Sequence, residues 1–309
     1  MTNPLTGIAH MLGHPFIRYA FFAGSGVAVA AGLTGYFLVL RAQVFTADAL
    51  SHVAVAGAMA ALAFGFDARL GLFVATTGVA LGMGLIGQRG KPDDVTIGSV
   101  FAWILGLGVL FLTIYTRSRS TSNSTAGITV LFGSVFGLSS SQALLAAVVS
   151  AGVVGELLLV ARPLLFATVD EAVARARGVP VTALGLGFLA LAAVTAAEAT
   201  QVVGALLLLG LVAAPAGAAR RLTTRPYRAM WLSALLGLAA MWAGLGLSYE
   251  VPALPPSFAV VAVAAGIYLV AAAAPAVRRS ARRRRSRATA APATGSLELD
   301  SQAAARTVM

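Results

Sequence analysis

Apolar residues occur along the chain in long runs, which short polar or basic segments separate. Most of these runs reach the length of about 17 to 25 residues that a helix needs to cross a bilayer. We therefore predict an all-α fold, a polytopic membrane helix bundle of eight or nine transmembrane helices. The nine predicted spans are residues 19–40, 47–66, 70–86, 95–115, 143–160, 181–197, 202–219, 230–248 and 258–274.

Composition supports the membrane assignment. Of the 309 residues, 59% are hydrophobic and 11% are charged, and the mean hydropathy is +0.87. This balance argues against a soluble domain. The absence of cysteine excludes disulfides, thiolate metal sites and cysteine nucleophiles. No cleavable signal peptide is expected, because the first basic residue is Arg18 and the basic leader of such a peptide is missing.

The net charge of +11 is concentrated near the C-terminus, where seven arginines lie between residues 278 and 287. Basic residues beside a final span favour a cytoplasmic orientation and contact with anionic lipid, rather than nucleic-acid binding. We therefore divide the chain into an N-terminal segment (1–18), a transmembrane domain (19–275) and a basic, disordered cytoplasmic tail (276–309).

Basic loops also predict the orientation of the remaining segments. Residues 220–228 contain four arginines and should share the cytoplasmic side with the tail. Counting back two spans at a time adds residues 166–180, residues 88–94 and Arg41 to this side. Nine spans would leave the N-terminus outside.

The most distinctive polar segment is FATVDEAVARARGVP at residues 166–180. Acidic residues occupy the first turn of a predicted helix, basic residues the last turn, and a glycine and a proline end it. These residues are Asp170, Glu171, Arg175, Arg177, Gly178 and Pro180. We predict a short, well-capped helix outside the bilayer, on which another protein docks.

Glycines predict close packing at two further places. The apolar segment 127–138 is too short to cross the membrane and is predicted to be re-entrant or interfacial, with Gly133 and Gly137 in close contacts. Gly78 and Gly82 would serve the same purpose in the third span. The match to G-x-G-x-x-G in this span lacks the strand and helix that a dinucleotide site requires.

The stretch TADALSHVAVAG at residues 46–57 carries the candidate chemistry. Asp48 and His52 lie four residues apart, so on a helix both side chains share one face. Ionisable residues are costly inside a membrane and usually line a pathway or meet a partner. A carboxylate and an imidazole suit zinc, manganese or iron(II). Two other interpretations stay open, in which Asp48 caps the helix and His52 is a satisfied core histidine.

Other polar residues give weaker signals. His10 and His14 also lie four apart, but a glycine and a proline between and beside them weaken any helix that would align them. Glu156 is expected to pair with Arg162 or else to face a cavity. The polar residues 198–201 are expected to separate two spans.

Catalytic motifs are missing. Lys91 follows a glycine, but Pro92 stands where a P-loop needs serine or threonine. The chain has three histidines and no H-E-x-x-H pair, so a membrane metalloprotease is also unsupported. We therefore predict no enzymatic activity and no cofactor of its own for this chain.

The segment DALSHVAVAG resembles the DALSH-x-x-x-x-G segment of the permeases of zinc/manganese-type metal ABC importers. Four further stretches agree with this family in the same order, so that the resemblance covers about residues 19–275. They are PDDVTIG at 92–98, VLFGSVFGL at 130–138, VDEAVARARGVP at 169–180 and VVGALLLLGLVAAPAGAAR at 202–220. The chain departs from the common pattern at Gly217, where PAGAA replaces PAATA, and in its arginine-rich tail.

The resemblance implies a permease homodimer in the cell membrane, in which each protomer docks a cytoplasmic helix into a separate ATPase subunit. It also implies that an extracytoplasmic metal-binding protein delivers Zn²⁺ or Mn²⁺. The docking role would fall on residues 170–178, and the transit site on Asp48 and His52.

Two rival functions remain. An ABC permease for a siderophore or cobalamin would need a wide pathway. An acid and an imidazole directed into that pathway would not be expected. An ion-coupled secondary transporter would show inverted repeats with matched broken helices, and the sequence has no convincing internal repeat.

Overall fold

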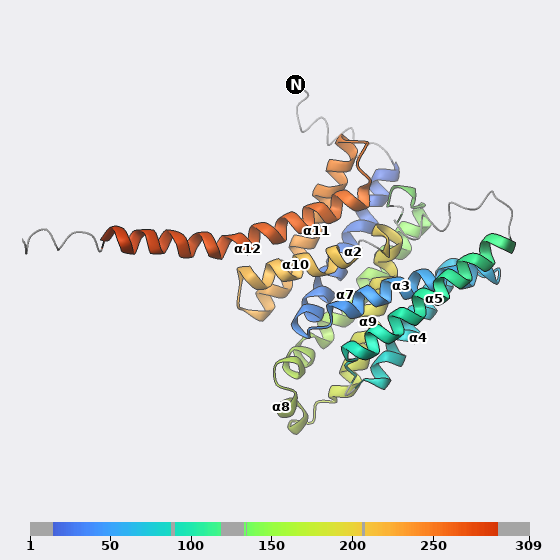
Figure 1. Ribbon diagram of the computed structural model, residues 1–309, viewed down its shortest axis with the longest axis horizontal. Helices are drawn as coiled ribbons and strands as arrows, with labels where there is room; N and C mark the ends of the chain where they lie inside the picture. Colours follow the sequence, from blue (N-terminus) through green and yellow to red (C-terminus); the bar gives the residue numbers. More distant parts are fainter. Residues whose placement is uncertain (1–14, 88–89, 119–132, 134, 206–207, 290–309) are drawn as a thin grey trace, which may run out of the picture.

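The computed structural model describes residues 15–87, 90–118, 133, 135–205 and 208–289, and within these ranges the chain is helical without a β-strand (Figure 1). The prediction of an all-α, polytopic membrane bundle is confirmed. The α-helices are α2 (Pro15–Leu40), α3 (Val44–Ala63), α4 (Ala68–Ile86), α5 (Asp94–Ser118), α7 (Ser140–Val169), α8 (Glu171–Ala176), α9 (Val181–Val203), α10 (Leu208–Leu222), α11 (Pro226–Glu250) and α12 (Pro256–Thr289).

The central helix is α2, which packs against α7, α9, α10 and α11. Small residues let the neighbouring backbones approach it closely, as expected where helices associate in lipid. Gly32 lies against Ala234 of α11, and Gly35 lies against the backbone of Val212 in α10. The Ser233 hydroxyl donates a 2.6 Å hydrogen bond to the Gly32 carbonyl. Helix α2 is therefore fixed in the core of the bundle.

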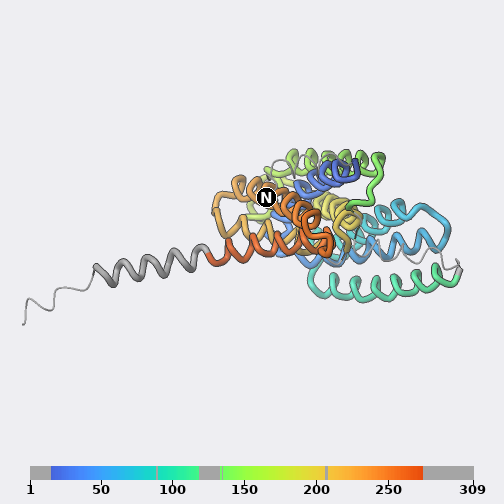
Figure 2. Tube along the Cα trace, turned by 90° about the horizontal axis from the view of Figure 1, so that it is seen from above, coloured from blue at the N-terminus to red at the C-terminus, as the bar shows by residue number. Residues whose placement is uncertain are grey.

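Helices α3, α4 and α5 form a second group, which α9 joins to the core. Gly57 of α3 and Gly71 of α4 mark the close crossing in this group, because a Cβ at either would overlap the other helix. The predicted close contacts at Gly78 and Gly82 do not form within the described part of the chain, since a Cβ at either position would meet none of its atoms within 4 Å. Seen from above, α5 and α7 lie on opposite sides of the bundle (Figure 2).

The break between α9 and α10 differs from the prediction. Residues 198–201 do not separate two spans, because α9 continues through them to Val203. The helix ends at Gly204, whose φ of 93° is a conformation that glycine adopts readily. Helix α10 has 15 residues and is not among the eight described helices that are long and apolar enough to cross a membrane. The predicted complete span at residues 202–219 is therefore wrong.

The described part of the short apolar segment 127–138 packs against the break between α9 and α10. Most of residues 127–138 lie outside the described residues, but Gly133 and a 3-10 turn, η2 (Val135–Gly137), are described. Gly133 has a φ of +73°, and a Cβ there would overlap the backbone of residues 202–204. Close packing at Gly133 is confirmed, whereas Gly137 is exposed.

Four of the segments predicted to be cytoplasmic share one end of the bundle, namely Arg41 and residues 88–94, 166–180 and 220–228. Lys91 contacts Glu171 of α8 at 3.5 Å, and the Arg220 guanidinium donates to the Val39 carbonyl at 3.1 Å, near Arg41. The start of α2 lies at the opposite end (Figure 1). The common end is confirmed; its cytoplasmic side stays a prediction.

Both predicted terminal boundaries shift. Helix α2 begins at Pro15, so residues 15–18 belong to the first long helix rather than to a preceding segment. Helix α12 continues to Thr289, so the part of the predicted disordered tail at residues 276–289 is helical. Residues 290–309 and the pair His10 and His14 lie outside the described residues.

Candidate functional site

Asp48 and His52 lie on one face of α3, one turn apart. The N-cap of α3 is Gln43, and Asp48 lies in the second turn, so the interpretation of Asp48 as the helix cap is wrong. Both side chains are half-buried, as is Val55 on the next turn. In the described part of the chain, neither the Asp48 carboxylate nor the His52 nitrogens are held in a hydrogen bond or ion pair. The pair is therefore available to a ligand.

Neighbouring side chains fix the position of this part of α3. The His52 ring meets the Phe101 ring of α5 edge to face, with centroids 5.1 Å apart. The fully buried Ser51 hydroxyl lies 2.7 Å from the Asp48 carbonyl oxygen and 3.2 Å from the Ala205 carbonyl oxygen. Ser51 thus connects α3 to the break between α9 and α10, and Phe101 connects His52 to α5.

Aspartate, glutamate and histidine residues elsewhere do not complete a metal site. Among the described residues, no three such side chains gather closely enough to hold an ion. Glu198 is buried in α9 at 7% exposure. Glu156 is exposed on α7, lining a pocket of about 320 Å³ between α7 and α9. The predicted pairing of Glu156 with Arg162 is wrong, since six residues place the two side chains on different faces of α7.

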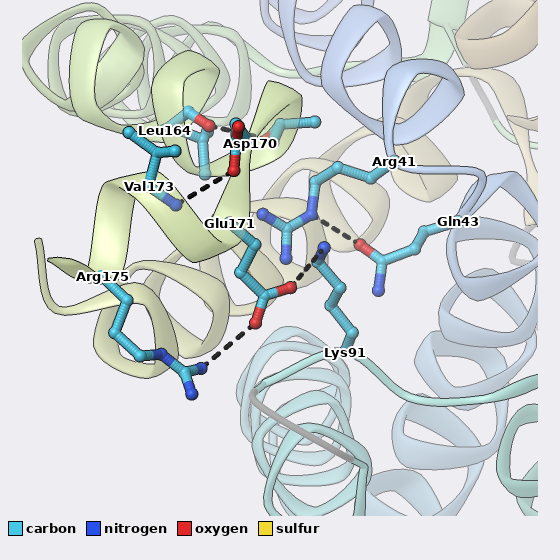
Figure 3. Close-up of polar contacts among 9 residues, drawn as sticks. Arg41, Gln43, Lys91, Leu164, Asp170, Glu171, Val173 and Arg175 are labelled. Atoms are coloured by element: carbon cyan, nitrogen blue, oxygen red, sulfur yellow. Dashed lines mark hydrogen bonds and ion pairs between the residues drawn. The ribbon is translucent and has the colours of Figure 1, made fainter.

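The predicted docking helix is shorter than expected. Residues 166–169 belong to α7, and α8 itself has six residues. Asp170 is its N-cap, and the carboxylate accepts a 3.0 Å hydrogen bond from the Val173 amide (Figure 3). Arg177 is the C-cap rather than part of the last turn.

The C-terminal end of α8 is a Schellman motif. The Val179 amide donates to the Ala174 carbonyl at 3.0 Å, and the Gly178 amide donates to the Arg175 carbonyl at 2.9 Å. Gly178 has a φ of +80°, which the motif requires and which glycine adopts at little cost. The prediction that Gly178 ends this helix is confirmed.

Helix α8 has an inner and an outer face. Ala174 is fully buried, and Glu171 points inward to Lys91, 3.5 Å away (Figure 3). Val173 is 44% exposed although it is apolar, and Arg177 is exposed as well. The outer face is therefore the part of α8 that another protein can reach.

The sequence did not reveal which residues lie against the inner face of α8. The sequence placed Arg41 and the loop that holds Lys91 on the cytoplasmic side, and it otherwise showed Lys91 only as a lysine that fails to complete a P-loop. Lys91 and Glu171 are 80 positions apart, so no spacing rule connects them. The available signal was their common placement on the side of the basic loops.

The fold and the site define a class of protein: a multi-pass membrane protein with an acid–imidazole pair on an interior helix and a capped helix exposed at one end. Residues 13–274 match the ABC 3 transport family, and the chain belongs to this family. It is thus a transport component and an integral membrane protein.

Several known relatives have similar lengths and names that describe metal transport. The chain is 27% identical over 246 residues to the manganese transport system membrane protein MntC of Halalkalibacterium halodurans, covering 79% of this chain and 82% of that protein. It is 28% identical over 237 residues to a probable iron transport system membrane protein of Haemophilus influenzae, covering 76% and 85%.

A solved structure has the same fold. PsaBC from Streptococcus pneumoniae, in complex with Fab, aligns with a TM-score of 0.75 at 23% sequence identity, over 87% of this chain and 95% of that chain. This likeness shows that the helices are arranged alike in the two proteins.

Proposed function

We propose that this chain is the permease subunit of an ABC importer for a divalent metal ion, manganese or zinc, and that Asp48 and His52 bind the ion in transit. The observation that carries the proposal is the half-buried, unpaired carboxylate and imidazole one turn apart on α3, in a member of the ABC 3 transport family. The manganese transport named in relatives supports the same cargo.

The chemistry of the pair fits transit rather than storage. A carboxylate oxygen and an imidazole nitrogen replace part of the hydration shell of Mn²⁺, Zn²⁺ or Fe²⁺. Two protein ligands leave the remaining coordination positions to water or to another chain. Such a site binds more weakly than a closed four-ligand site, and a transported ion must be able to leave.

The partners follow from the same proposal. A separate ATPase subunit docks on the outer face of α8, and an extracytoplasmic metal-binding protein supplies the ion at the opposite end. A second copy of this chain completes the passage, and it packs against α5, which is the least buried of the described long helices. Anionic lipids contact the arginines near the C-terminus.

Uptake by the complete transporter tests this function. Permease and ATPase subunits are reconstituted in vesicles with the metal-binding protein, and entry of ⁵⁴Mn²⁺ and ⁶⁵Zn²⁺ is followed with and without ATP. We expect ATP-dependent entry of one or both, and Fe²⁺ and a ferric siderophore are added as competitors. Competition by the siderophore alone, without entry of a free ion, would support the rival chelate permease and overturn the proposal.

Docking on α8 gives a separate prediction. Val173→Asp places a charge on the outer face of α8 without changing its caps, and burying that charge against the ATPase subunit is costly. We expect the amount of ATPase subunit that co-purifies to fall at least about tenfold. Glu250→Gln is the control, because Glu250 is the exposed last residue of α11, at the opposite end of the bundle. This variant should retain the ATPase subunit. Equal co-purification of both variants would exclude the outer face of α8 as the docking surface.

A further inference from the structure

Glu171 joins α8 to the rest of the permease. Its carboxylate lies 3.1 Å from an Arg175 nitrogen within α8 and 3.5 Å from the Lys91 ammonium, and 22% of its side chain is exposed. Figure 3 shows this side chain on the inner side of α8, directed toward Lys91 and Arg41. The carboxylate is therefore placed to act within the permease rather than on the outer face.

Lys91 is held at the entrance to α5. Its loop is fixed by Gly90, which has a φ of +72° and packs against the backbone of α9 at Gly185. Three residues after Lys91, α5 begins, and the Asp93 carboxylate caps it by accepting a 3.1 Å hydrogen bond from the Thr96 amide. Lys91 is thus separated from the first turn of α5 by only two residues, one of which caps this helix.

Arg41 holds a similar place between α2 and α3. Its guanidinium lies over the Phe188 ring, 5.3 Å from the centroid, and its Nε donates a 2.9 Å hydrogen bond to Gln43, the N-cap of α3. One guanidinium nitrogen and the Gln43 amide nitrogen are buried and have no hydrogen-bond partner among the described residues. Burial lowers the pKa of Arg41 to about 10, and the negative charge of Glu171 opposes this shift. Arg41 therefore stays charged at neutral pH and faces the Glu171 carboxylate.

These two cations lie at the starts of the helices that carry the candidate transit site. Helix α3, which follows Arg41, holds Asp48 and His52, and α5, which follows Lys91, holds Phe101 against the His52 ring. We propose that Glu171 is a positioning residue, which transmits movement of α8 to α3 and α5 through Lys91 and Arg41. This inference rests on the proposed function, since it requires an ATPase subunit that moves α8.

The physical basis is that ion pairs partly shielded from water are less screened than exposed pairs. A carboxylate between cations from two other segments gives α8 a preferred position relative to both. Removing the charge leaves α8 capped by Asp170 and Gly178, so the helix still forms and docks, but its movement no longer carries α3 and α5 with it.

The test compares ATP hydrolysis with metal uptake in the reconstituted transporter. For Glu171→Gln and Lys91→Gln we expect normal co-purification of the ATPase subunit and about tenfold less metal entry per ATP hydrolysed, a typical coupling effect. The double variant should lose no more than Glu171→Gln alone, because Lys91 acts through the carboxylate that this variant already lacks. Lys91→Arg, which keeps the charge, should restore most of the uptake, and Glu250→Gln should behave as wild type.

Two outcomes would overturn the inference. One is unchanged metal entry per ATP in both glutamine variants, which would make the contact incidental. The other is loss of the ATPase subunit in proportion to uptake in Glu171→Gln, which would make Glu171 a docking contact. Failure of the proposed function is distinguishable from both, since the wild-type transporter would then take up no metal.

Discussion

Asp48→Ala and His52→Ala should each reduce ATP-dependent metal uptake by about 10- to 100-fold, the range seen when groups that support a bound metal are removed. Each change removes one of only two protein ligands on α3. Asp48→Asn should lose nearly as much as Asp48→Ala, because the amide keeps the shape of the side chain but not its charge. Uptake of ⁵⁴Mn²⁺ or ⁶⁵Zn²⁺ in the reconstituted transporter measures the effect.

Assembly and ATP hydrolysis separate this loss from misfolding. Co-purification of the ATPase subunit should stay normal in all three variants, since these side chains belong to α3 and not to the outer face of α8. Val55→Ala is the matched control, because Val55 is half-buried on the same face of α3, one turn beyond His52, and offers no ligand. Wild-type uptake by both Asp48→Ala and His52→Ala would remove the transit site from the proposal.

Gly35→Ala should lower the stability of the permease markedly, whereas Gly78→Ala should not. A Cβ at Gly35 would overlap the backbone carbonyl of Val212 in α10, and a backbone atom has no alternative rotamer. Overpacking of this kind costs about 1 to 3 kcal/mol, which for a chain of this size corresponds to a decrease of about 2 to 5 °C in the melting temperature.

Gly78 provides the matched comparison. It also lies in an apolar helix, but a Cβ there would meet no atom within 4 Å, and alanine favours a helix more than glycine does. Thermal unfolding of the two purified variants in the same detergent measures the difference. Equal melting temperatures would show that α2 and α10 do not approach each other as closely as the structure indicates.

The spanning helices could be predicted from the sequence because hydrocarbon imposes one simple requirement, a long apolar helix. The end of α8 was equally predictable, since Gly178 and the acidic and basic turns act locally. Prediction failed where distant segments meet. Residues 198–201 look like a polar boundary, but tertiary packing keeps them helical, and the glycine that breaks the helix comes at Gly204.

The candidate site likewise has one part that the sequence predicts and one part that it does not. The pairing of Asp48 and His52 follows from helical spacing alone, and the structure keeps both residues on one face of α3. Arg41 and Lys91 could not be assigned beside Glu171, because nothing in a single sequence shows which loops at one end of a bundle touch. The role of Gly78 was misjudged for the same reason, since a glycine in an apolar helix does not reveal which face a neighbour covers.

The length of α7 has a consequence for what can reach α8. Helix α7 has 30 residues, about 45 Å at 1.5 Å per residue, whereas the hydrocarbon layer is about 30 Å thick. Arg162 is followed by seven more residues of the helix, which ends at Val169, roughly 10 Å farther along its axis. Helix α7 is thus longer than the hydrocarbon layer requires, and its excess length is enough to carry α8 beyond that layer.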